Sequence, residues 1–215
     1  MENPNLRLLA LTDGVIAITI TLLILELRLP EGFGAFSDAE LWGALLGLWP
    51  RILAYLISFA VIGIYWINHH AKFAHIVKSD RGLLLINLIF LLFVGIVPFT
   101  TTLIAENPDS VGTAVYAGGM IACGLALAWL WSYAGRAGLI DPGFEKSGRT
   151  RLLVSTLVSS AIFAVSVPLS FAHPDAAKLF WILILPANIA LRTIGMIIWK
   201  LRHPGEPMPG RPSRD

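Results

Sequence analysis

The sequence has few charged residues and almost no cysteine. Charged residues make up 14% of the 215 positions, whereas hydrophobic residues make up 56% and the mean hydropathy is +0.72. So little polar surface cannot cover a soluble globule of this size. The single cysteine, Cys123, excludes an intramolecular disulfide and offers no metal-ligand spacing. The composition therefore predicts an integral membrane protein.

Recognised catalytic and nucleotide-binding motifs are also missing. The patterns HExxH, GxSxG, Walker A and GxGxxG do not occur, and no basic stripe suited to nucleic acid is present. His69 and His70 are adjacent, so they point about 100° apart on a helix, and no carboxylate follows them until Asp80. We therefore expect no enzyme activity, no metal, no cofactor and no nucleic-acid partner.

Six apolar segments are each long enough to cross a bilayer, at about 20 residues per crossing. They cover residues 7–29, 41–68, 83–105, 111–134, 151–172 and 178–200. Trp49, Pro50 and Arg51 interrupt the second segment, which either begins as an interfacial piece or carries a kink. The pattern predicts an all-α integral membrane protein with six transmembrane helices in one domain, 1–203, followed by a disordered tail, 204–215, rich in Pro and Gly.

Basic residues are distributed unequally between the two sets of loops. One set, together with both termini, carries residues such as Arg7, Lys78 and Arg149, whereas the opposite set carries only Arg28 and Lys178. The positive-inside rule therefore predicts that both termini are cytoplasmic. The opposite loops are rich in Asp and Glu, which form either a vestibule that concentrates cations or an ordinary solvated surface.

The first segment places a carboxylate, Asp13, at the edge of its apolar run. A charge there is costly unless it faces protein or water, so we expect Asp13 to have a partner in its own subunit. At 100° per residue, Ile18, Leu22 and Leu25 share a narrow stripe, with Thr21 about 60° to one side and Asp13 about 140° from Ile18. Periodicity alone leaves open whether this stripe faces a symmetry axis, lipid or a neighbouring helix.

Several parts of the sequence resemble one family of channels. The residues Arg7-Leu-Leu-Ala-Leu11-Thr12-Asp13-Gly14 resemble the RxxxFSD signature that opens the first helix in the transmembrane protein 175 family of lysosomal and prokaryotic potassium channels. Leu11 replaces the usual Phe, and Thr12 replaces the usual Ser. The stretches GVIAITITLLILEL, YWINHH at 65–70 and LLLINLIFLLFVGIVPFTT at 83–101 are also similar to this family. Separated matches in the same order are more specific than any one of them.

The resemblance implies a homotetramer in the membrane lipid of a prokaryotic plasma membrane, with a potassium-selective leak pore lined by the first helix. The family's apolar constriction corresponds to Ile18, with Leu22 and Leu25 further out, and its threonine layer corresponds to Thr21. No TVGYG-like filter occurs, so selectivity for potassium ions is expected from side chains and pore hydration.

The resemblance also implies that Arg7, Thr12 and Asp13 anchor the pore helix through contacts with the next two helices. A paired Arg and Asp would be an economical way to keep both charges near hydrocarbon, but the sequence leaves the exact pairing open. The polar candidates on those helices are Trp66, Asn68, His69, His70 and Asn87. The competing function is a proton-conducting channel or a proton-coupled transporter, since the family is linked with proton permeability and the chain contains Asp13, His69 and His70.

Overall fold

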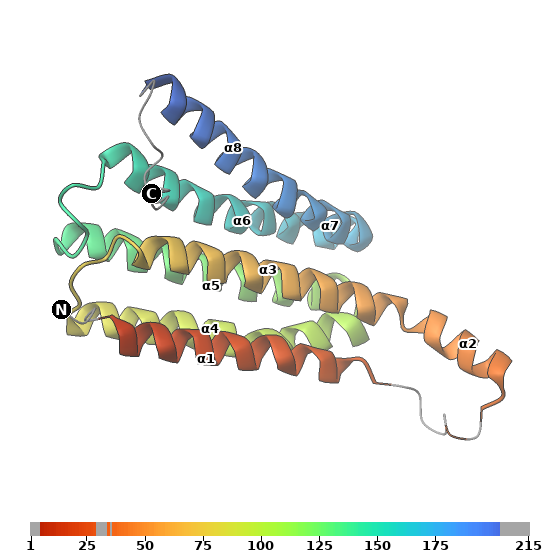
Figure 1. Cartoon of the computed structure of the whole chain (residues 1–215). Helices are drawn as coiled ribbons and strands as arrows, with labels where there is room; N and C mark the ends of the chain where they lie inside the picture. Colours follow the sequence, from red (N-terminus) through yellow and green to blue (C-terminus); the bar gives the residue numbers. More distant parts are fainter. Residues whose placement is uncertain (1–4, 29–33, 35, 203–215) are drawn as a thin grey trace, which may run out of the picture.

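The computed structural model describes residues 5–28, 34 and 36–202, which form one bundle of helices running in alternating directions (Figure 1). The elements are α1 (Leu6–Leu22), η1 (Leu23–Glu26), α2 (Asp38–Gly47), α3 (Trp49–Phe73), α4 (Arg81–Glu106), α5 (Ser110–Arg136), α6 (Lys146–Ala172), α7 (Pro174–Phe180), η3 (Trp181–Leu183) and α8 (Ile184–Arg202). The two described ends of the chain lie at the same end of the bundle, and we call the opposite end the distal end.

Within the described residues, six helical stretches are long and apolar enough to cross a membrane. They are Leu6–Leu25, Trp49–Phe73, Arg81–Glu106, Ser110–Arg136, Lys146–Ala172 and Pro174–Ile198. Each overlaps one of the six segments expected from hydropathy, so the predicted all-α class with six membrane-spanning helices is confirmed. The predicted tail, 204–215, lies outside the described residues.

The second apolar segment is divided between two helices. The short helix α2 has no buried residue and projects past the distal end of the bundle (Figure 1). A capping box begins it, because Ser37 N–H donates to Glu40 Oε2 at 2.8 Å and Ser37 Oγ accepts from Glu40 N–H at 3.5 Å. The spanning helix α3 then starts at Trp49, where Pro50 in the first turn lacks an N–H that would have no helical partner. The membrane-spanning part is therefore later in the sequence than hydropathy alone suggests.

The interior is centred on α5, which packs between α4 and α6. Its Met120, Cys123 and Leu127 are completely buried, so Cys123 is a small core side chain. Polar groups in this interior are hydrogen-bonded to one another. Ser58 Oγ lies 2.8 Å from Thr101 Oγ1 and 2.9 Å from Tyr116 Oη. Such bonds reduce the cost of placing hydroxyls among apolar side chains.

The connection between α3 and α4 holds the start of α1. Asn5 Nδ2 donates to the carbonyl of Ile76 at 2.7 Å, and Ile76 forms an isolated antiparallel bridge with Ile140. His75 stacks on Phe144 with ring centroids 3.7 Å apart. The first helix therefore enters the bundle from a fixed position.

Candidate functional site

The first helix has one face inside the helix bundle and one face outside it. Leu8, Thr12, Ile16 and Thr19 are buried at helical spacing, and α3 and α4 cover this side. Leu23 continues the buried side into η1 and is completely covered. The buried face includes two threonine hydroxyls, those of Thr12 and Thr19.

The opposite face contains all four residues expected at the pore. Ile18 is 60% exposed and Leu25 is 62% exposed, and Leu22 and Thr21 are exposed beside them. Ile20, by contrast, is partly buried and packs against the core. The structure therefore brings Ile18, Leu22, Leu25 and Thr21 together on one surface that faces away from the rest of the helix bundle.

Thr21 presents only its acceptor side to this surface. Its hydroxyl donates to the Ile18 carbonyl at 2.8 Å. Because a hydroxyl has one proton and two acceptor lone pairs, the oxygen remains able to bind a cation or a water proton. Thr19 donates to the Val15 carbonyl at 2.9 Å but lies on the buried face, so of these two threonines Thr21 is the exposed one.

A chain of buried polar side chains joins α1 to α4 and α3. Asn87 Nδ2 donates to Thr12 Oγ1 at 2.9 Å, and Asn87 Oδ1 lies 2.9 Å from His69 Nε2. Since an amide oxygen can only accept, His69 carries its proton on Nε2. Phe73 and Phe90 stack on the His69 ring at centroid distances of 4.3 and 5.6 Å. These contacts hold each member of the chain in one orientation.

Asp13 has a hydrogen-bond partner within the same chain, as expected, and this partner is an indole. Trp66 Nε1 donates to Asp13 Oδ1 at 2.9 Å. Arg7 and Asp13 both lie in the described part of the chain, and no ion pair within 4 Å joins them, so the economical Arg–Asp pair is not the arrangement found here. Six residues apart, their directions differ by about 120° and their Cα atoms by about 9 Å along the axis. Arg7 is exposed at the start of α1.

The remaining two candidates have different surroundings. Asn68 is buried on the side of α3 that faces α6. Its Oδ1 accepts from Ser155 Oγ at 3.4 Å, and its Nδ2 has no hydrogen-bond partner among the residues that the structure describes. His70 is exposed, and its ring centroid lies 5.9 Å from that of Trp66. The structure therefore connects Trp66, His69 and Asn87 to α1, directly or through one neighbour, and turns Asn68 away from it.

Lys72 is a buried cation that sequence reasoning missed. A lysine near the end of an apolar segment is expected at the membrane boundary, yet the Lys72 side chain is completely buried between α3 and α6. Its ammonium donates to Thr156 Oγ1 at 2.5 Å, to the Leu152 carbonyl at 3.0 Å and to the Asn68 carbonyl at 3.4 Å. Its position four residues after Asn68 was the available signal, because that spacing puts both residues on one helix face.

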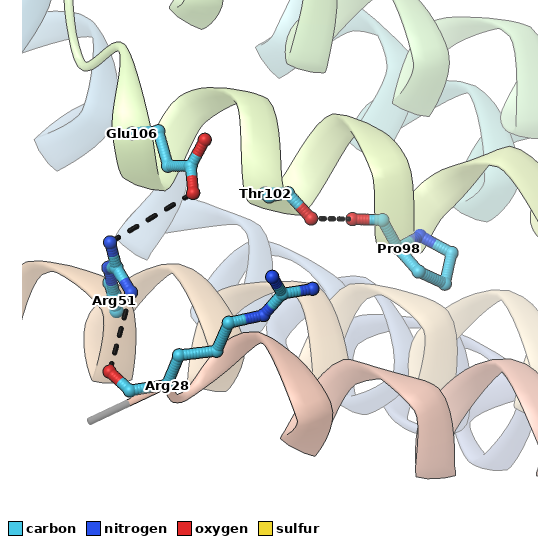
Figure 2. Close-up of polar contacts among 5 residues, drawn as sticks. All are labelled: Arg28, Arg51, Pro98, Thr102 and Glu106. Carbon is cyan, nitrogen blue, oxygen red and sulfur yellow. Dashed lines mark hydrogen bonds and ion pairs between the residues drawn. The ribbon is translucent and has the colours of Figure 1, made fainter. Parts of the chain in front are cut away.

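Arg51 contacts the residues that follow α1 and η1 at the distal end of the bundle. Figure 2 shows the Arg51 side chain between Arg28, just after η1, and Glu106, the last residue of α4. Arg51 Nη1 donates to the Arg28 carbonyl at 3.4 Å, and Nη2 lies 3.9 Å from Glu106 Oε1. The half-exposed carboxylate makes this a weak contact on its own.

Pro98 interrupts the backbone hydrogen bonds of α4 near its distal end. Thr102 Oγ1 donates to the Pro98 carbonyl at 3.0 Å, as Figure 2 shows, and Thr101 Oγ1 donates to the Val97 carbonyl at 2.9 Å.

No cluster of three His, Cys, Asp or Glu side chains suited to a metal ion occurs in the part of the chain that the structure describes.

Comparison with known proteins places these residues in a family. Residues 7–98 match the family described as endosomal/lysosomal potassium channel TMEM175. A potassium channel of Streptomyces collinus is 37% identical over 192 residues, which cover 83% of this chain and 92% of that protein.

Two further comparisons agree with this match. The crystal structure of a lysosomal potassium-selective channel TMEM175 homologue from Chamaesiphon minutus is 30% identical, with a TM-score of 0.71, over 87% of this chain and 95% of that one. The human endosomal/lysosomal proton channel TMEM175 is 38% identical over 110 residues, 47% of this chain and 22% of that longer protein. The match to the Streptomyces collinus channel covers most of both chains, and the fold is shared with the Chamaesiphon minutus homologue. Together these findings show that the chain belongs to the TMEM175 family of ion channels.

Proposed function

We propose that this chain is one subunit of a homotetrameric, potassium-selective leak channel whose pore is lined by α1. The observation that carries the proposal is the two-sided surroundings of this helix: buried hydrogen bonds hold one face, and Ile18 is 60% exposed on the other. Membership of a family whose bacterial members are named potassium channels supports the same function.

The exposed face of α1 that carries Gly14, Ile18 and Thr21, called here the outer face, is suited to close contact with other helices. Gly14 is exposed and a Cβ built on it would meet no atom within 4 Å, and Ala17 is exposed one turn later. Small residues allow helices in a membrane to approach closely. Four copies of this face around an axis would bring their Ile18 side chains together.

A ring of Ile18 side chains would control the hydration of the pore. A narrow apolar ring excludes water, so a partly hydrated cation meets a barrier there, and a small rotation of the helix changes the ring width. Leu22 and Leu25 would extend the apolar section towards the distal end. Thr21, whose oxygen lone pairs are exposed, would replace part of the hydration shell of potassium.

The location follows from the charge of the loops. We place both termini in the cytoplasm of a prokaryotic cell, with the chain in the plasma membrane, because the basic residues gather at the end that carries the termini. The subunit is surrounded by membrane lipid. The distal loops, which carry most of the loop carboxylates, then face outward.

Proton conduction is the second candidate, and the Thr12, Asn87 and His69 chain is the observation that favours it. Relatives from animals are named proton channels. These three hydrogen-bonded side chains are buried, however, and they meet α1 on the side opposite Ile18. A path for protons would therefore be separate from the path proposed for potassium.

Ion flux into liposomes that contain the purified protein tests the two functions. A potassium-selective leak gives a current that reverses near the potassium equilibrium potential and does not respond to an imposed pH gradient. A reversal potential that follows the proton gradient would contradict the proposal and support the second candidate.

A matched pair of variants tests the pore-lining face. Ile18→Asn should keep the ring wet and raise flux while lowering selectivity. Ile20→Asn, placed about 160° away on the packed side, should lower stability without raising flux. A thiol reagent should likewise block Ile18→Cys more than Ile20→Cys. Equal effects at the two positions would show that α1 does not line the pore.

A further inference from the structure

A cavity of about 420 Å³ lies at the distal end of the bundle, on the side away from the outer face of α1. Its walls come from the first turns of α3, the end of α4 with the residues just after it, Tyr116 of α5, and the α7–η3 segment. The volume falls within the range of roughly 300–1,000 Å³ that is usual for small-molecule pockets. The candidate pore machinery uses none of the lining residues.

The wall of this cavity offers hydrocarbon and almost no free polar atoms. The polar atoms of two lining aromatic residues are already bonded inside the bundle: Tyr116 Oη lies 2.9 Å from Ser58 Oγ, and Trp181 Nε1 donates to Ser166 Oγ at 2.8 Å. Leu53 and Ile57 add apolar surface from α3. An apolar cavity of this kind does not hold ordered water, so its occupant must be apolar over most of its length.

The mouth of the cavity is at the boundary of the membrane. Trp49, the first residue of α3, and Leu179 in α7 both line it and are exposed. The spans that contribute these residues begin at Trp49 and Pro174, so the mouth lies at the depth where acyl chains meet headgroups. Hydrocarbon chains are therefore the most abundant apolar groups that can reach it.

The rim adds two opposite charges. Lys178 Nζ lies 2.8 Å from Asp175 Oδ1 and donates to the Pro108 carbonyl at 3.0 Å. Its side chain is 22% exposed, whereas that of Asp175 is 92% exposed. A headgroup with one phosphate and one ammonium complements this pair, because its phosphate can approach Lys178 while its ammonium approaches Asp175.

We infer that this cavity binds one acyl chain of a zwitterionic phospholipid, with the phosphate beside Lys178 and the ammonium beside Asp175. Chain and cavity are both apolar, so the stabilisation comes from dispersion contacts along the wall, which an empty cavity lacks, and from the headgroup charges. The site does not depend on what passes along α1.

Native mass spectrometry of the full chain, titrated with phosphatidylethanolamine in mild detergent, tests the binding. Ala54→Trp fills the cavity, whereas Leu56→Trp adds the same side chain on the exposed side of α3. We expect one tightly held lipid per subunit in the wild type and Leu56→Trp, and roughly tenfold weaker binding in Ala54→Trp. Equal binding in all three proteins, or none in the wild type, would overturn the inference.

A second measurement needs no core variant. Phosphatidylethanolamine with a photoreactive group at the end of one chain should label peptides that contain Leu53–Ile57 or Trp181 in the unaltered protein. Labelling confined to other peptides, or a covalent bridge from Trp49→Cys to a neighbouring subunit, would show that something else occupies the site. Lys178→Gln should reduce the preference for phosphatidylethanolamine over an uncharged diacylglycerol, and an unchanged preference would remove the headgroup from the assignment.

Discussion

Replacing Asn87 by leucine should weaken the packing of α1 against α3 and α4. The substitution keeps the approximate size of the side chain and leaves both Thr12 Oγ1 and His69 Nε2 without the partners that now lie 2.9 Å away. Both residues are buried, and each stranded polar group costs about 1–3 kcal/mol. Hydrogen bonds within membrane bundles measure near the low end of such ranges, so we expect a total loss of about 2–3 kcal/mol in the free energy of unfolding.

Thermal unfolding of the purified protein in detergent measures this loss. For a chain of this length each kcal/mol corresponds to roughly 2–4 °C, so the midpoint should fall by about 4–12 °C. Thr21→Val provides the control, because it removes a hydroxyl from an exposed position of the same helix and should change stability by no more than about 0.5 kcal/mol.

A double variant shows whether the effect passes through the hydrogen bond. Once Thr12→Val has removed the hydroxyl that Asn87 binds, Asn87→Leu leaves only His69 without a partner. The double variant should therefore lose less free energy of unfolding than the sum of the two single losses. Additive losses, or a loss in Asn87→Leu no larger than in Thr21→Val, would refute the view that this chain anchors the first helix.

Three further predictions concern other contacts of the same subunit. Trp66→Phe removes the donor to Asp13 and should lower the yield of assembled protein in size-exclusion chromatography before selectivity changes; altered selectivity with normal assembly would instead put Asp13 in the ion path. Thr21→Val should lower the potassium-to-sodium permeability ratio in liposomes, and an unchanged ratio would locate selectivity elsewhere. Burial lowers the pKa of His75 from its ordinary 6.5, against the opposing effect of Asp141, so the neutral ring stabilises the fold above that pH and the contribution is lost as pH falls. His75→Phe should therefore flatten the fall in unfolding midpoint below about pH 6.5, and an unaltered pH profile would assign it to other groups.

Hydropathy located the six spanning helices because the bilayer imposes a minimum length on any apolar helix. The same measure set the second span too early, because α2 is apolar but lies beyond the distal end of the bundle. Composition describes how apolar a segment is. The capping box at Ser37 determines where α2 begins, and the position of Pro50 determines where α3 begins.

The anchor of the first helix shows a different limit. Thr12, Asp13, Trp66, His69 and Asn87 were all identifiable as polar residues in apolar segments, since such residues need partners. Their pairing was not, because it depends on how α3 and α4 are rotated against α1. That rotation joins Asp13 to Trp66 and leaves Arg7 exposed. It also turns Asn68 towards α6 and buries Lys72.

The sequence by itself determined the class of protein, its membrane spans and the grouping of Ile18, Thr21, Leu22 and Leu25 on one side of a helix, because these depend on composition and on a helical period that no neighbour alters. Only the tertiary structure decided that this side is the exposed one. The buried hydrogen bond from Asn87 to Thr12 rotates α1 so that its other face meets α3 and α4. Such a bond joins residues 75 positions apart, and local sequence patterns do not reach across that distance.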